Sequence, residues 1–496
     1  MSRKLIILTA VMAVALSGAA FAAVQNIKVS GDIAMQGVAR NLSMEAKKTS
    51  DGGSSMENLM DAQEYFTSQV RLRFDADLTE NVSGTVRLIN ERLWGAESNS
   101  DTDIDLDLAY IHMKEFLYQP LTITVGRQNL RYGNAFIVGD PDTNQTSSEA
   151  TPSEQVTQGG TTYNNRVMGD MSLRKSFDAA RAVFDFSPFT VDLVAAKPVE
   201  GDSFKYDDVN MFGMNAAYQW GSLDGITEGY FWAVTNPHNI ARSANGDDLF
   251  QPKENQSVVY TLGGRMQFNP IEKLTLGGEA GYQFGDVVLP AGGSLGDLDA
   301  TGINEYRHLS AGAAQVYGEY RFMTKYNPKM GFIYTFKSGD DDANSGNSSS
   351  HYAGESTYNE WQTLFEDQTQ GEIINVLFAN TNCHVITVSG SLMPREDITV
   401  GLNYTWLAQA QKDTEAQDSG AYGWFKPVSG PARSNLYSVK LDEDYVASEV
   451  DAYATYDYTE DVQLKLTGAW FIPGDYFNEN NDGVAYSARA GINLNF

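Results

Sequence analysis

Apolar and polar residues alternate along most of this chain with the two-residue period of β-strands. In residues 64–78, Phe66, Val70 and Phe74 fall on one face, and Gln69 and Arg71 fall on the other. Each strand of this kind separates an apolar environment from a wet one. Eighteen such strands are predicted, at residues 27–40, 64–78, 81–94, 104–116, 120–130, 177–187, 189–197, 209–220, 225–234, 257–269, 272–285, 306–322, 327–338, 381–393, 396–409, 446–459, 461–472 and 484–496.

The connections between these strands alternate in length. Short turns rich in Pro, Asn, Asp and Gly join one strand of each pair to the next, as at residues 79–81, 187–189 and 269–272. The long connections are residues 131–176, 236–256, 286–305, 339–380 and 410–445. The pattern predicts an all-β, transmembrane, antiparallel up-and-down β-barrel of about 18 strands, with short periplasmic turns and long extracellular loops. A soluble β-sandwich would not require short connections at one end of the strands and long connections at the other.

The two ends of the chain support a barrel in the bacterial outer membrane. Residues 1–22 have two basic residues, an apolar run and a final Ala-Phe-Ala, which predicts a cleaved signal peptide and a barrel over residues 23–496. No later run of 18 apolar residues could form a membrane helix, so any membrane crossing must use strands. The last strand ends on Phe496 and resembles the signal that the barrel-assembly machinery reads.

Aromatic residues gather where the predicted strands approach the short turns. In a membrane barrel they would form an interfacial girdle, whereas in a soluble protein they would fill a core. The residues concerned are Phe116, Phe186, Phe189, Trp220, Phe268, Phe322, Tyr458 and Phe496.

Charge and cysteine content exclude several function classes. Removing Arg3 and Lys4 leaves 33 basic against 64 acidic residues, a net charge of −31, which argues against a nucleic-acid partner. Cys383 is the sole cysteine, and its neighbour His384 would point to the opposite face of a strand. The five histidines show no metal-ligand spacing. We therefore expect no enzyme activity and no cofactor; a hydrolase would require loops to assemble distant Ser, His and Asp residues.

A barrel of this size leaves an aqueous lumen, so its inward side chains become the functional surface. Strand parity predicts eight inward cations, which are outnumbered by only eleven inward acidic residues. Arginine suits a pore because its guanidinium stays charged and can pass a carboxylate or hydroxyl from one donor set to the next. Pairing that merely stiffens the wall is the alternative. The predicted cations are Arg71, Arg73, Arg87, Arg181, Arg265, Arg321, Lys465 and Arg489.

The connection at residues 339–380 carries eight acidic residues and no lysine or arginine. Asp340, Asp342 and Asn344 have the spacing of a calcium loop, but Ser345 and His351 occupy the positions that need Gly and Glu. We therefore predict no dedicated metal site here. The connection is interpreted as a solvated extracellular loop that at most gathers divalent cations weakly.

Four stretches of the chain resemble motifs of the alginate export family of outer-membrane porins. Residues 126–133 read Gly-Arg-Gln-Asn-Leu-Arg-Tyr-Gly, and residues 176–181 read Ser-Phe-Asp-Ala-Ala-Arg. Residues 334–346 contain Ser-Gly-Asp-Asp, and residues 471–477 are similar to the last hairpin of the family. The order and spacing of the motifs carry the resemblance.

The resemblance implies a monomeric 18-stranded barrel whose cation-lined pore exports an anionic polysaccharide. Arg127, Arg131 and Arg181 match family positions and join the predicted pore lining. Phe136 stands where the family has its next arginine, and the predicted lumen is mixed in charge, so a neutral or different anionic solute fits equally well. We predict passive diffusion, with selectivity set by the wall and by infolding of residues 131–176. The open alternatives are a general porin for small solutes and a sleeve around a partner protein.

Overall fold

The structure is a computed structural model of the 496-residue chain. It describes residues 26–42, 44, 63–95, 104–141, 153–158, 161–166, 171–200, 208–221, 223–237, 256–289, 305–340, 357–378, 380–412, 440, 443–477, 479 and 482–496. The predicted signal peptide lies outside these residues. Over the described residues, no helix is long and apolar enough to span a bilayer.

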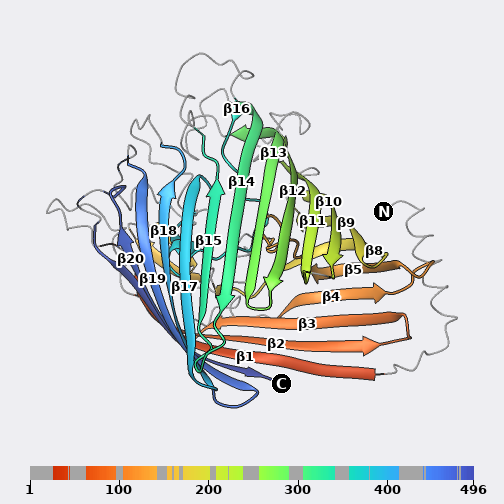
Figure 1. The fold of residues 1–496 in the computed structure, drawn as a ribbon, viewed down its shortest axis with the longest axis horizontal. Helices are drawn as coiled ribbons and strands as arrows, with labels where there is room; N and C mark the ends of the chain where they lie inside the picture. The colour runs from red at the N-terminus through yellow and green to blue at the C-terminus, as the bar shows by residue number, and fades with distance from the viewer. Residues whose placement is uncertain are drawn as a thin grey trace.

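Eighteen antiparallel strands form the wall of a closed barrel (Figure 1), which confirms the predicted fold class. The predicted bounds are correct to within four residues. The wall strands are β1 (Asn26–Asn41), β2 (Gln63–Asp77), β3 (Val82–Leu93), β4 (Asp105–Met113), β5 (Leu121–Asn129), β8 (Ser176–Asp185), β9 (Phe189–Val199), β10 (Val209–Trp220), β11 (Gly225–Pro237), β12 (Gln256–Ile271), β13 (Leu274–Leu289), β14 (Glu305–Arg321), β15 (Lys329–Lys337), β17 (Cys383–Arg395), β18 (Ile398–Gln409), β19 (Tyr445–Asp457), β20 (Val462–Pro473) and β21 (Ala485–Asn495).

The first and last strands close the wall. Residues 32–41 of β1 pair antiparallel with residues 486–495 of β21. Beyond the last strand residue, Gly31 and Phe496 exchange two backbone hydrogen bonds, of 2.8 and 2.9 Å between nitrogen and oxygen. A Cβ on Gly31 would lie 2.5 Å from the Arg71 carbonyl oxygen and 2.7 Å from the Phe496 ring. Glycine is therefore needed where the C-terminal residue seals the seam.

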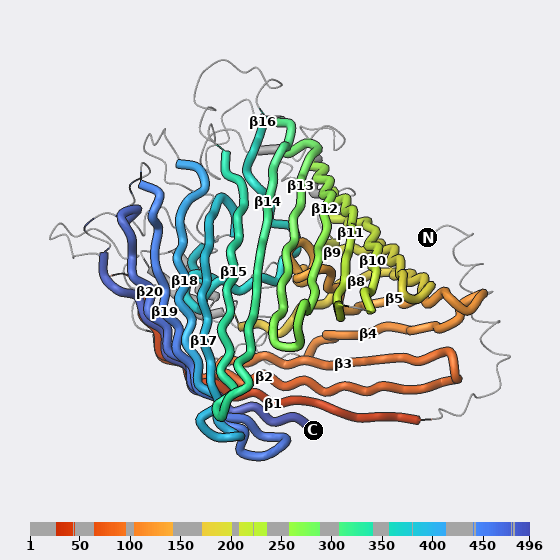
Figure 2. Tube along the Cα trace, in the orientation of Figure 1, coloured from red at the N-terminus to blue at the C-terminus, as the bar shows by residue number. Residues whose placement is uncertain are grey.

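Four smaller elements belong to the long connections. β6 (Ser153–Gln158) and β7 (Thr161–Arg166) pair only with each other. β16 (Thr357–Tyr358) runs parallel to β14, and α2 (Ile374–Leu377) is a single helical turn. Figure 2 shows that parts of the long connections cross the barrel interior behind the wall strands.

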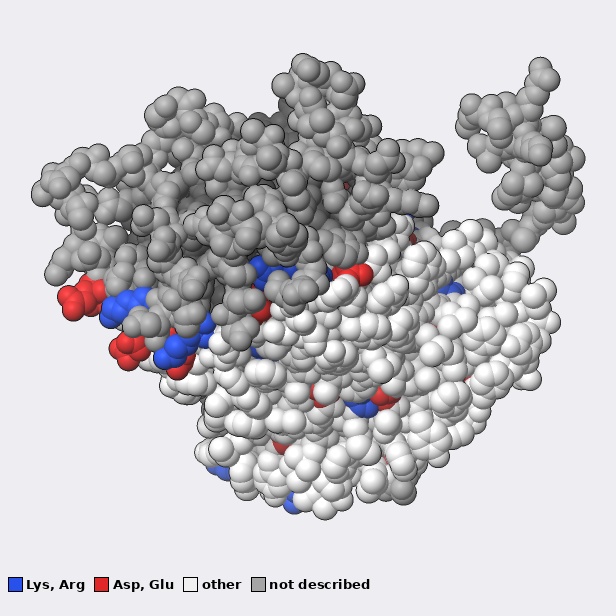
Figure 3. Space-filling view, turned by 90° about the horizontal axis from the view of Figure 1, so that it is seen from above, with Lys and Arg blue, Asp and Glu red and all other residues white. Residues whose placement is uncertain are grey.

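The wall reverses the burial pattern of a soluble protein. Outward residues such as Phe66 and Leu262 are 59% and 57% exposed, while lumen-facing Thr67 and Gln69 are 1% exposed. In the view of Figure 3, the described outer surface is mostly uncharged. Seven of the eight predicted girdle aromatics are exposed, and Phe268 is half-buried. Such an outer surface is stable only against lipid.

Candidate pore and its lining

The structure places the side chains of eight predicted pore cations on the lumen face of the wall. Gln69, Arg71 and Arg73 alternate with the exposed outward residues Phe66 and Val70 along β2. The same alternation turns inward the other members of the set, which are Arg87, Arg181, Arg265, Arg321, Lys465 and Arg489. Their contact with a solute remains a prediction.

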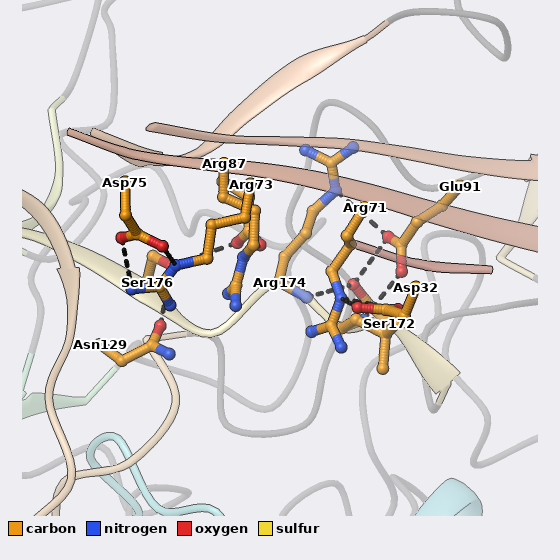
Figure 4. Close-up of polar contacts among 12 residues, drawn as sticks. Asp32, Arg71, Arg73, Asp75, Arg87, Glu91, Asn129, Ser172, Arg174 and Ser176 are labelled. Atoms are coloured by element: carbon orange, nitrogen blue, oxygen red, sulfur yellow. Dashed lines mark hydrogen bonds and ion pairs between the residues drawn. The ribbon is translucent and has the colours of Figure 1, made fainter. Parts of the chain in front are cut away.

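On β1 to β4, each of these arginines contacts a carboxylate (Figure 4). Arg71 Nε lies 3.0 Å from Asp32, and Arg73 Nε lies 2.7 Å from Asp75. Arg87 pairs with Asp107, which is itself buried. Arg71 and Arg73 follow one another along β2, and Arg87 of β3 is in register with Arg73. This side of the lumen therefore presents ion pairs and not bare cations.

Other strands of the wall repeat this pairing. Arg181 pairs with Asp192, Arg265 with Glu228 at 2.7 Å, and Arg321 with Glu319 at 2.9 Å. Arg489 of β21 lies 2.9 Å from Glu372, which belongs to a long connection. Among the described residues, Lys465 alone of the predicted cations has no carboxylate within ion-pair distance. The pairing alternative raised from the sequence therefore holds for most of the set.

Arg127 departs from the predicted lining. It shares its face of β5 with Val125, which is 46% exposed, and it lies 3.0 Å from Asp178, whose side chain is 60% exposed. Both positions are outward, so the pore-lining role carried over from the family motif is wrong for this residue. Asp178 is in turn in register with Lys197, and this charged row ends the apolar band of the outer face.

Arg131 follows the end of β5 and lies on no wall strand. Its guanidinium pairs with Asp367 at 2.5 Å, and Lys175 contacts the same carboxylate at 2.5 Å. Lys175 is also 3.6 Å from Asp140. Both ends of the connection between β5 and β8 thus meet the connection between β15 and β17 at one cluster of charges.

Two inner segments occupy the half of the lumen next to the long loops. The first inner segment is residues 130–141 and the second is residues 357–378. They join through backbone hydrogen bonds, among them Phe365 N to the Ile137 oxygen at 3.1 Å and Asp367 N to the Ala135 oxygen at 2.9 Å. The predicted infolding of residues 131–176 is borne out for this first segment. The solvated loop predicted at residues 339–380 is wrong for the second, because Trp361, Ile373 and Leu377 are buried.

Two apolar clusters fill the space between the inner segments and the wall. In the first, Phe136 and Trp361 stack at 6.0 Å and pack against the lumen-facing Trp232 and Met211. Burial in this cluster raises the pKa of the Tyr132 phenol. In the second cluster, Ile373, Leu377 and Phe378 pack against β17 to β21. The barrel thus has a packed core at one end.

Buried polar contacts fasten the second inner segment to the wall. Glu449 of β19 is fully buried and accepts hydrogen bonds from Ile373 N at 2.8 Å and Ile374 N at 2.7 Å. Lys337 of β15 pairs with Glu366, and both side chains are almost wholly inaccessible. No strand-period argument could identify these residues as anchors, because their partners lie in segments without alternation.

A third inner segment, residues 171–175, lies against β2 and β3. Gln69 donates to the Met171 carbonyl at 2.7 Å, and Arg174 lies 3.2 Å from Glu91 and 2.7 Å from Asp105. Ser172 also donates to Glu91 at 3.0 Å (Figure 4). Arg174 therefore extends the row of paired arginines from the wall into the lumen, and its position could not be found from strand parity.

Of the three residues with calcium-loop spacing, the structure describes one. Asp340 is buried against Arg307, with 3.4 Å between oxygen and nitrogen, while Asp342 and Asn344 lie outside the described residues. In the described part of the chain, no group of three or more His, Cys, Asp and Glu side chains could hold a metal ion. Cys383 pairs in register with Lys337 and His384 with Phe336, so the two neighbours do face opposite ways.

Comparison with known proteins identifies related sequences and folds. The model of the alginate export family matches residues 170–491, while no curated protein matches the chain. Among solved structures, Acinetobacter baumannii OccAB2 is 10% identical with a TM-score of 0.51, over 95% of this chain and 98% of the other. Pseudomonas aeruginosa OccK8 (OprE) is 11% identical with a TM-score of 0.51, over 96% of this chain and 99% of the other. At such identities the likeness concerns the fold alone.

Proposed function

The chain belongs to the alginate export family and forms a channel in the bacterial outer membrane, and from that premise we propose that it passes small hydrophilic solutes by passive diffusion. The observation that carries this proposal is the pairing of the lumen arginines. Arg71, Arg73, Arg265 and Arg321 each lie within 3.0 Å of a carboxylate. A paired guanidinium keeps donors for hydroxyl groups, but it attracts a polyanion far less than a bare cation does.

Export of an anionic polysaccharide is the second candidate. Family membership favours it, and so does the row of Arg71, Arg73, Arg87 and Arg174 along one side of the lumen. The two candidates differ in the balance of charge that a permeating ion meets. A wall of neutralised pairs gives weak ion selectivity, whereas a polyanion route needs a surplus of positive potential.

A sleeve around a partner protein is disfavoured by the inner segments. Trp361, Phe365 and Leu377 occupy the lumen together with the wall residues that they contact. A protein partner would have to displace this packed core, whereas a small solute needs only the remaining polar space.

Reversal potential in planar bilayers separates the two channel candidates. With a KCl gradient across the membrane, the proposed channel gives a reversal potential that is not displaced toward the chloride value, because the lumen pairs leave no surplus of positive charge. A potential near the chloride equilibrium value would contradict the small-solute proposal and support polyanion export. Absence of any conductance from correctly folded protein would reject both.

A further inference from the structure

The half of the lumen next to the short turns contains a polar cavity of about 620 Å³. We call it the periplasmic chamber. β20, β21, β1 and β2 form its wall, the turn at residues 457–463 forms its floor, and Leu173 of the third inner segment reaches it from above. Its polar wall residues are lumen-facing by strand parity, so the chamber lies inside the barrel and not on the lipid side.

Small residues make the wall hollow here. Ala34 is in register with Asn493, and Gln36 is in register with Gly491. A Cβ on Gly491 would lie 3.3 Å from Gln36 Cγ, so even an alanine would crowd the neighbouring amide. Ala34, which lines the chamber, and the adjoining Gly491 therefore leave the wall recessed between longer side chains.

Side-chain amides dominate the polar lining. Gln463 donates to Asp457 at 2.7 Å, and Gln36 donates to Gln69 at 3.4 Å. In the described part of the chain, Asn493 and Asn495 have no side-chain hydrogen bond. The five amides of the chamber are Gln36, Gln69, Gln463, Asn493 and Asn495. An amide both donates and accepts, which matches the dual character of a hydroxyl group.

The charges of the chamber do not suit an anion. Arg71 is its one cation and is already paired with Asp32 at 3.0 Å. Asp457, Glu460 and Asp461 line the floor. A carboxylated polymer would meet four acidic side chains against one arginine, and like charges at short range repel even when water screens them.

We propose that the periplasmic chamber is a binding subsite for an uncharged, polyhydroxylated solute, a neutral carbohydrate of a few sugar units. This proposal rests on the proposed passive channel and specifies the solute class that the channel retains. The accessible amides of Gln36, Gln463, Asn493 and Asn495 exchange hydrogen bonds with the sugar hydroxyls, and those of Asn493 and Asn495 gain partners without breaking contacts within the protein. Gln69 is buried and holds Gln36 in place.

Single-channel recording in the presence of maltotriose tests the subsite. Maltotriose added on the short-turn side should reduce the current through the full-length protein in a concentration-dependent way. A trimer of glucuronate at the same concentration should block less, because of the acidic floor. Asn493→Leu keeps the size of the side chain and removes its donor and acceptor for the sugar hydroxyls, which should weaken maltotriose block about three- to tenfold. Gln463→Leu should act in the same direction.

Asn403→Leu is the matched control. Asn403 is a lumen-facing amide of β18 that does not line the chamber, so its replacement should leave maltotriose block unchanged. Unchanged current steps without sugar show that a variant has folded. If maltotriose gives no block, if the glucuronate trimer blocks more strongly, or if Asn493→Leu behaves like Asn403→Leu, the subsite is rejected. Ion conductance without sugar block would reject the subsite alone, whereas absence of conductance would reject the channel itself.

Discussion

The two halves of the lumen use the same wall in opposite ways. Next to the long loops, lumen-facing Met211, Trp232 and Leu309 are apolar and pack against the inner segments. Next to the short turns, lumen-facing Gln463 and Asn493 are polar and border a hollow chamber. We call these regions the filled half and the hollow half.

The difference shows that a lumen-facing side chain in this barrel is not always in contact with water. A lumen residue is polar where water or solute reaches it, and it is apolar where another part of the chain covers it. In the proposed channel, the filled half would restrict the size of the solute, and the hollow half would provide the hydrogen-bonding surface. The paired arginines Arg71 and Arg73 lie along the side of the lumen that the apolar clusters leave free.

Breaking the buried Lys337–Glu366 pair should have the largest effect on the difference between the filled half and the hollow half. Lys337→Met leaves the Glu366 carboxylate buried without its partner, which costs about 3–5 kcal/mol. The second inner segment should detach, so single-channel conductance should rise and become noisy. The double variant Lys337→Met with Glu366→Met removes both charges and should recover most of the quiet, low conductance. A single variant with wild-type conductance would show that the pair does not hold the segment.

Weakening the Glu449 anchor should have a smaller effect on the same segment. Glu449→Gln replaces one of two acceptor oxygens by a donor that faces a backbone N–H, which costs about 1–3 kcal/mol. Brief, reversible steps to higher conductance are expected. Glu396→Gln, on an exposed turn, is the control and should record like the wild type. Equal records for both variants would contradict the anchoring role.

In the hollow half, no described inner segment fills the lumen, so we expect its stability to depend on closure of the wall between β1 and β21. Gly31→Ala places a methyl group 2.5 Å from the Arg71 oxygen and against Phe496, and such crowding costs about 1–3 kcal/mol. Urea unfolding in detergent should shift to lower urea, with little change in the conductance of folded channels. Gly229→Ala is the matched control, because a Cβ there meets no atom within 4 Å. A large rise in conductance for Gly31→Ala would contradict the proposed separation of roles.

Removing Lys465, the predicted pore cation without a carboxylate partner among the described residues, should give the smallest change in channel properties. Lys465→Gln deletes a positive charge without orphaning a carboxylate, so unfolding should be unaffected. The reversal potential should shift slightly toward cation preference. Arg321→Gln, which releases Glu319 from its pair, should shift it further in the same direction. A reversed order would mean that the paired arginines do not screen their carboxylates.

The wall could be predicted from the sequence because lipid imposes a strict period on it. The segment predicted at 64–78 corresponds to β2 at Gln63–Asp77, and that predicted at 484–496 corresponds to β21 at Ala485–Asn495. In each case one face must be apolar along its whole length. The same parity placed Arg71, Arg265 and Arg489 on the lumen face.

The inner segments could not be predicted, because no period marks them. Trp361, Phe365 and Leu377 lie in a stretch that reads as an acidic loop, and only packing against Trp232 or Phe471 explains their burial. Arg127 was misassigned for a different reason. A sequence motif carries no information on which face a side chain takes, whereas its neighbour Val125 shows that this position faces outward.

The accessibility of a thiol at one lumen position in each half tests the division into a filled and a hollow half most directly. Both Ala311→Cys on β14 and Asn493→Cys on β21 place a thiol on the lumen face, in a Cys383→Ala background. With a water-soluble, membrane-impermeant thiol reagent, the cysteine at 493 should react rapidly and the cysteine at 311 should remain unmodified in the folded channel. Rapid modification at both positions would contradict the filled half, and protection at both would contradict the chamber.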